Sequence, residues 1–114
     1  MLGCDGSYDP ITLWSLQQRK LFQKLKWETD SIGDYPSIYS CCFAKGKEDF
    51  IIAASVGLNE LKLFEYDYGC YKSTWKTDGL DKGVFSCDIC PGNDMIAFGG
   101  ADKNVYLCAL SSVI

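Results

Sequence analysis

An internal repeat constrains the fold of this chain more than any other feature of its sequence. Residues 39–66 align with residues 85–110, and single-residue insertions or deletions fall only where turns are expected. Residues 11–14 form a third, partial copy that aligns with residues 61–64. The period of about 44–50 residues is typical of proteins in which each repeat packs on its neighbours and cannot bury its apolar face alone.

Each copy consists of short apolar segments separated by Gly, Asp, Asn, Lys and Ser. The segments are rich in Ile, Val, Phe, Tyr and Leu, which favours β-strands, and the frequent turn residues leave little room for long helices. The predicted strands are residues 11–16, 38–43, 50–55, 61–66, 84–89, 95–98 and 105–110. We therefore expect an all-β fold.

Residues 16–27 allow two interpretations. Their apolar and basic side chains have the spacing of a short amphipathic helix, which would suit a membrane surface or a calmodulin-like partner. The alternative is a strand that ends at residue 16, a turn at 17–20, and a second strand with Leu21, Leu25 and Trp27 on one face. We favour two strands, because the repeat requires strands at this place.

The last copy reads FSCDICPGNDMIAFGGADKNVYLCAL, and the partial first copy reads GCDGSYDPITLWSL. This order of apolar, Ser, Pro–Gly, small-residue and apolar–x–Leu elements resembles the WD-repeat family of β-propellers. The resemblance covers residues 2–110. The copies depart from the family's pattern in two respects. No Trp–Asp dipeptide is present, and no Gly–His dipeptide is present, so the hydrogen-bond network of Asp, His, Ser and Trp typical of strong WD repeats cannot form.

The resemblance implies a partial β-propeller built of four-stranded antiparallel blades. Its approximate units are residues 1–28 (a partial unit), 37–79 and 83–110. Closed propellers typically have four to eight blades. About two and a half units therefore imply a fragment or short isoform of a larger WD-repeat protein, or a chain whose further blades come from another chain.

The resemblance also implies a non-catalytic protein-interaction scaffold, since members of that family bind other proteins through loops at one rim of the disc. Transferred by alignment, those loops are residues 33–37, 56–60, 78–83 and 101–104. The candidate interaction residues are Tyr35, Asn59, Tyr68, Trp75 and Asn104. We expect the other aromatic side chains, Trp14 and Tyr39 among them, to occupy strand positions in the core or at the rim.

Composition excludes several other classes of protein. The 114 residues include no histidine, which removes Ser–His and Cys–His catalysis and histidine-ligated metal sites. A net charge of −4 gives no global attraction to nucleic acid, and no apolar run is long enough to cross a membrane. We predict no enzymatic activity, no cofactor, and neither a nucleic-acid nor a membrane partner.

Seven cysteines, an odd number, and the lack of a secretory signal indicate reduced thiols and a cytoplasmic protein. Cys87 and Cys90 form a Cys–x–x–Cys pair, so a cysteine-based metal-binding or redox module is the alternative function. Residues three apart on a strand point to opposite faces. We therefore favour a buried structural role for these thiols and predict no metal site.

Overall fold

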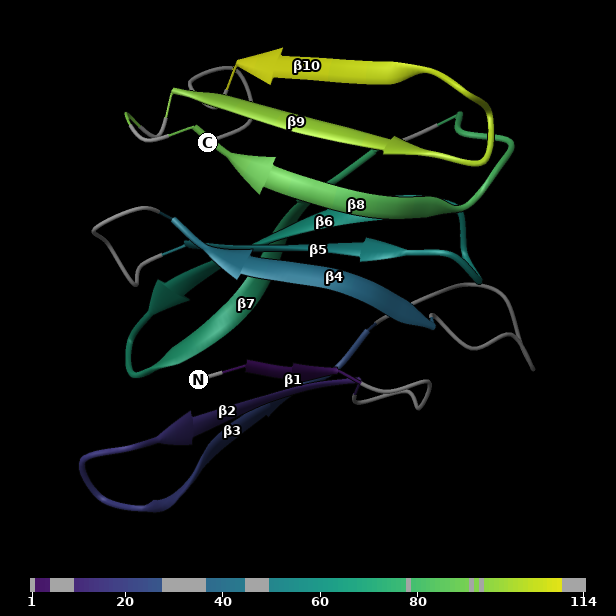
Figure 1. The fold of residues 1–114 in the computed structure, drawn as a ribbon. Helices are drawn as coiled ribbons and strands as arrows, with labels where there is room; N and C mark the ends of the chain where they lie inside the picture. The colour runs from purple at the N-terminus through teal and green to yellow at the C-terminus, as the bar shows by residue number, and fades with distance from the viewer. Residues whose placement is uncertain are drawn as a thin grey trace.

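The computed structural model describes residues 2–4, 10–27, 37–44, 50–77, 79–90, 92 and 94–109. Over these residues it contains ten β-strands in three antiparallel sheets (Figure 1). The N-terminal sheet consists of β1 (Leu2–Cys4), β2 (Ile11–Ser15) and β3 (Lys20–Leu25). The middle sheet consists of β4 (Ile38–Phe43), β5 (Phe50–Ser55), β6 (Glu60–Asp67) and β7 (Cys70–Lys76). The C-terminal sheet consists of β8 (Val84–Ile89), β9 (Met95–Gly100) and β10 (Val105–Ala109).

The all-β prediction is confirmed, and within each sheet the strands lie in chain order. Strands β1 and β7 are additional to the predicted strands. The sequence of β7, CYKSTWK, has no apolar pattern because it is mostly polar and lies at the edge of the middle sheet. Strand β9 extends beyond the predicted 95–98 to include Gly99 and Gly100. In the described part of the chain, no helix has the length and apolar character needed to cross a membrane.

Residues 16–27 form a turn followed by a strand, which confirms the two-strand interpretation and contradicts the helical one. Strand β2 ends at Ser15, and the turn occupies 16–19, one residue earlier than predicted. The backbone N–H of Gln18 donates to Ser15 Oγ at 3.2 Å, which stabilises this turn in place.

The prediction that Leu21 shares a face with Leu25 is wrong. Leu21 is 41% exposed, whereas Leu25 is buried. Leu21 pairs with Trp14 and Gln23 pairs with Leu13, so Phe22 is an extra residue in β3 without a partner in β2. Such a β-bulge moves the side chains on its far side to the opposite face of the sheet.

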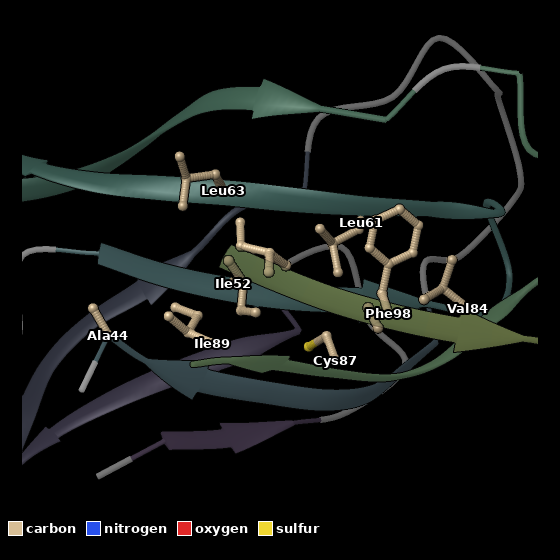
Figure 2. Packing of buried hydrophobic residues seen from close by; sticks show 10 residues of the cluster. Ala44, Ile52, Leu61, Leu63, Val84, Cys87, Ile89 and Phe98 are labelled. Carbon is tan, nitrogen blue, oxygen red and sulfur yellow. The ribbon is translucent and has the colours of Figure 1, made fainter. Parts of the chain in front are cut away.

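The three sheets stack face to face, with the middle sheet between the other two (Figure 1). One buried cluster lies between the middle and C-terminal sheets, and Figure 2 labels Ala44, Ile52, Leu61, Leu63, Val84, Cys87, Ile89 and Phe98 of it. A second cluster, between the N-terminal and middle sheets, consists of Ile11, Leu13, Leu25, Trp27, Ile38, Ile51, Ala53 and Phe64. Strand β5 contributes to both, which explains its unbroken apolar sequence FIIAAS. The stack is flat, with principal dimensions of 41 × 36 × 20 Å.

The hydrogen-bonding register repeats from sheet to sheet. Tyr39 is an extra residue in β4 opposite β5, and Phe85 is an extra residue at the same place in β8 opposite β9. In the N-terminal sheet the register of β2 shifts between Leu13 and Trp14. In the middle sheet the register of β6 shifts at the aligned position, after Leu63. The bulges therefore fall at positions that the sequence repeat aligns.

Candidate protein-interaction rim

The strand connections that the structure describes lie at two opposite rims of the stack (Figure 1). We call one of them the loop rim; it holds the turns 56–59 and 101–104 and the connection 79–83. The opposite rim holds the turns 16–19 and 68–69 and the connection between β8 and β9. The predicted interaction loops 56–60 and 101–104 and the described part of the loop 78–83, residues 79–83, thus share one rim. Most of the loop 33–37 lies outside the described residues.

Asn59 joins two connections of the loop rim. It ends the turn 56–59 with a φ of 54°, in the left-handed region that Asn tolerates better than most residues. Its side-chain Nδ2 donates to the carbonyl oxygen of Asp81 at 3.2 Å. Inside the turn, the N–H of Leu58 donates to Ser55 Oγ at 3.0 Å. Asn59 therefore fixes the turn relative to the connection 79–83.

Asp102 and Tyr106 form a hydrogen-bonded pair at the turn 101–104. The Tyr106 hydroxyl donates to Asp102 Oδ2 at 2.5 Å, and the N–H of Asn104 donates to Asp102 Oδ1 at 3.1 Å. These hydrogen bonds hold the pKa of Asp102 below its ordinary value, and the bond from Tyr106 has the largest effect. The carboxylate in turn raises the pKa of Tyr106. At neutral pH an anionic Asp102 thus accepts from Asn104, at the end of the turn, and from Tyr106 on β10.

Backbone contacts fix the connection 79–83 between the two turns. The N–H of Ala101 donates to the carbonyl oxygen of Gly83 at 3.0 Å. A Cβ on Gly83 would lie 2.8 Å from the carbonyl oxygen of Val56, and a Cβ on Gly100 would overlap the carbonyl oxygen of Gly83. Glycine permits these close approaches. The three connections therefore form one continuous surface.

An exposed aromatic pair lies beside this surface. The side chains of Tyr39 and Phe85 are 66% and 43% exposed, and their ring centroids are 5.5 Å apart. Both residues lie at the loop-rim ends of their strands. Close by, the backbone N–H of Val56 donates to the carbonyl oxygen of Ser37 at 3.1 Å. Tyr39 occupies a strand position as predicted, but the bulge turns it outward from the core. Sequence reasoning did not select this pair, although the aligned copies place an aromatic residue at both positions.

Trp27 is buried at the loop-rim end of the N-terminal sheet and is 1% exposed. Its Nε1–H donates to Glu60 Oε1 at 2.6 Å, and Lys62 Nζ lies 5.0 Å from the ring centroid. Lys76 Nζ lies 3.9 Å from Glu60 Oε2. The ring also meets Phe64 edge-on at 6.0 Å. These polar groups join two sheets, which indicates a structural role for Trp27.

The other predicted interaction residues do not gather at the loop rim. Tyr68 is 95% exposed but lies on the opposite rim, in the two-residue turn between β6 and β7. Its φ of 48° and the φ of 87° at Gly69 are typical of a tight hairpin turn. Trp75 is half-buried and packs against the cluster between the middle and C-terminal sheets. Tyr35 lies outside the described residues, and Asn104 is exposed on the loop rim.

Trp14 lies near the opposite rim and lines a shallow pocket with Ser15, Leu16 and Arg19. Its side chain is 47% exposed, and that of Leu16 is 66% exposed. Trp14 occupies a strand position as predicted, but its ring is not buried in a core. The pocket is part of an exposed apolar surface on the N-terminal sheet.

Cys87 and Cys90 have different surroundings. Cys87 is buried in the cluster between the middle and C-terminal sheets (Figure 2). Its thiol donates to the carbonyl oxygen of Ser40 at 3.8 Å. A hydrogen bond with Cys42 and then burial raise the pKa of Cys87, so its thiol stays protonated at neutral pH. The Cys90 thiol instead donates to Asp94 Oδ1 at 2.5 Å. The described residues contain no group of three or more Cys, Asp or Glu placed to hold a metal ion.

No protein-family model matches the chain, and its sequence matches no curated protein.

Proposed function

We propose that the chain is a non-catalytic protein-interaction scaffold, built as a segment of a WD-repeat-like β-propeller, and that it binds protein partners through the loop rim. The repeated register supports the blade interpretation, because the middle and C-terminal sheets carry the same bulge at the start of β4 and β8. The face-to-face stacking of successive antiparallel sheets is also the packing used by propeller blades.

The observation that carries the binding proposal is an exposed aromatic pair beside connections that are already held in place. Aromatic side chains dominate binding energy at many protein interfaces, and Tyr39 and Phe85 offer two rings in contact. The contacts of Asn59 and Gly83 fix the adjacent loops before a partner arrives. Such preorganisation reduces the entropy lost on binding.

The predicted residues take different places in this proposal. Asn59 and Asn104 lie on the loop rim and would be direct or supporting contacts. Tyr68 lies on the opposite rim and would serve a separate partner. Trp75, which is half-buried, has less surface to offer than the aromatic pair.

The experiment is a quantitative capture of binding proteins from cell extract with three forms of the full chain. These are the wild type, a Tyr39→Ala/Phe85→Ala variant, and Tyr68→Ala as a matched aromatic truncation on the opposite rim. We expect at least one protein to be retained by wild type and Tyr68→Ala but lost by the double variant. With that protein purified, its dissociation constant should rise at least about tenfold in the double variant.

Two results would count against the proposal. An unchanged set of bound proteins in the double variant would show that the aromatic pair is not an anchor. Loss of the same proteins with Tyr68→Ala instead would assign binding to the opposite rim. Far-UV circular dichroism of each variant checks that the truncation leaves the strands intact.

A further inference from the structure

The two ends of the stack expose apolar side chains that have buried counterparts in the middle sheet. Val105 and Leu107 on β10 are 78% and 69% exposed. They pair with Gly99 and Ala97 of β9. In the middle sheet, Leu61 and Leu63 pair in the same way with β5 and are fully buried.

The register shows that these positions are equivalent. Leu61 and Leu63 lie opposite Ala54 and Ile52, which the sequence repeat aligns with Gly99 and Ala97. The exposed fractions therefore differ because a neighbouring sheet packs on one of the two faces and not on the other. The face that carries Leu61 and Leu63 packs against β8 and β9, whereas none of the described residues covers the face that carries Val105 and Leu107.

The N-terminal sheet also has an exposed apolar side chain, Trp14, whose counterpart in the middle sheet is buried. Trp14 follows the register shift in β2, as Phe64 follows it in β6. Phe64 is 2% exposed because it packs in the cluster between the N-terminal and middle sheets, while Trp14 is 47% exposed. Leu13 faces the middle sheet, and Trp14 lies beyond the bulge on the outer face, next to its pairing partner Leu21.

Each internal interface has the same order. In the repeat, Leu13 and Leu107 align with Leu63, and Trp14 and Cys108 align with Phe64. At both internal interfaces, the face of one sheet that carries the Leu63 position packs on the face of the next sheet that carries the Phe64 position. The match for the Val105 and Leu107 face is therefore the Trp14 face. Within one chain these two faces lie at opposite ends of the stack, so only another copy brings them together.

We propose that two copies of this chain associate head to tail, with the outer face of the C-terminal sheet of each copy packed on the outer face of the N-terminal sheet of the other. Two copies supply six sheets, which is within the range of closed propellers, and closure leaves neither apolar face exposed. The inference rests on the repeat architecture in the proposed function but does not depend on binding at the loop rim.

The test is sedimentation equilibrium of the chain in reducing buffer, so that its cysteines cannot cross-link copies. We expect a reversible species of about 25 kDa, twice the 12.7 kDa of one chain. Val105→Asp/Leu107→Asp and, separately, Trp14→Asp should each raise the dimer dissociation constant at least about tenfold. Tyr68→Asp, which places the same charge on an exposed turn, should leave dimerisation unchanged. Val105→Thr/Leu107→Thr keeps good strand-forming residues and should also weaken the dimer, which separates docking from folding.

Mixing the two Asp variants tests the head-to-tail geometry. Each mixed pair retains one undamaged junction, between the C-terminal sheet of the Trp14→Asp chain and the N-terminal sheet of the Val105→Asp/Leu107→Asp chain. We expect the mixture to associate more tightly than either variant alone. A monomeric wild type, a normal Trp14→Asp dimer, or assemblies larger than two copies would overturn the proposal. A wild-type dimer whose bound proteins are unchanged by Tyr39→Ala/Phe85→Ala would count against the proposed function alone.

Discussion

Trp27 places an indole N–H inside the interface between the N-terminal and middle sheets, where the side chain is 1% exposed. Its bond to Glu60 is 2.6 Å long, and the Glu60 side chain is only 12% exposed. We predict that Trp27→Phe lowers the free energy of unfolding by about 1–3 kcal/mol, because the largely buried Glu60 carboxylate loses the indole donor and keeps the more distant Lys76 near it. Glu60→Gln, which keeps an acceptor oxygen, should cost less. Urea denaturation measures both, and wild-type stability of Trp27→Phe would contradict this role.

The Asp102 and Tyr106 pair makes a prediction about pH. The pKa of Asp102 is lowered in the folded state, so its contribution to stability is present above the ordinary carboxyl pKa and is lost as pH falls through the lowered value. Tyr106→Phe removes the main cause of the shift. We expect an NMR titration to show the pKa of Asp102 moving upward, toward the ordinary value of an aspartate, in this variant. An unchanged titration of Asp102 would show that the Tyr106 hydroxyl does not hold this carboxylate.

Strand β9 meets the connection that precedes β8 at Gly100, where a side chain has no room. We predict that Gly100→Ala destabilises the chain by about 1–3 kcal/mol, since its Cβ would overlap the carbonyl oxygen of Gly83. Gly92→Ala is the matched control, because its Cβ would lie an ordinary 3.6 Å from Asp94 Oδ1. Thermal unfolding should separate the two variants. Equal melting temperatures would mean that Gly100 and the carbonyl oxygen of Gly83 leave room for a methyl group.

Strands with a clear apolar pattern could be predicted from the sequence, and strands held by their neighbours could not. FIIAAS in β5 is apolar throughout because both of its faces are covered. CYKSTWK in β7 has no such pattern and is a strand because β6 supplies hydrogen-bond partners. The position of Leu21 was wrong because a bulge is a property of a strand pair, and periodicity along a single strand does not reveal it.

At the scale of the whole molecule, the repeat predicted equivalent positions but not which of them are covered. Leu63 and Leu107 are aligned in the sequence, yet the first is buried and the second is 69% exposed. Asn59 and Asn104 became candidates through the alignment with WD repeats, and their part in binding stays a prediction. The contact between Tyr39 and Phe85 depends on how two sheets stack, which a single sequence does not reveal.

The middle sheet lies between two sheets of equivalent register. Amide hydrogen exchange, resolved by residue, tests this arrangement most directly. We predict the slowest exchange in β5 and β6, whose apolar side chains are buried in both clusters, and faster exchange in β3 and β10, which lie at the edges of their sheets. Protection in β3 or β10 equal to that in β5 would contradict this arrangement.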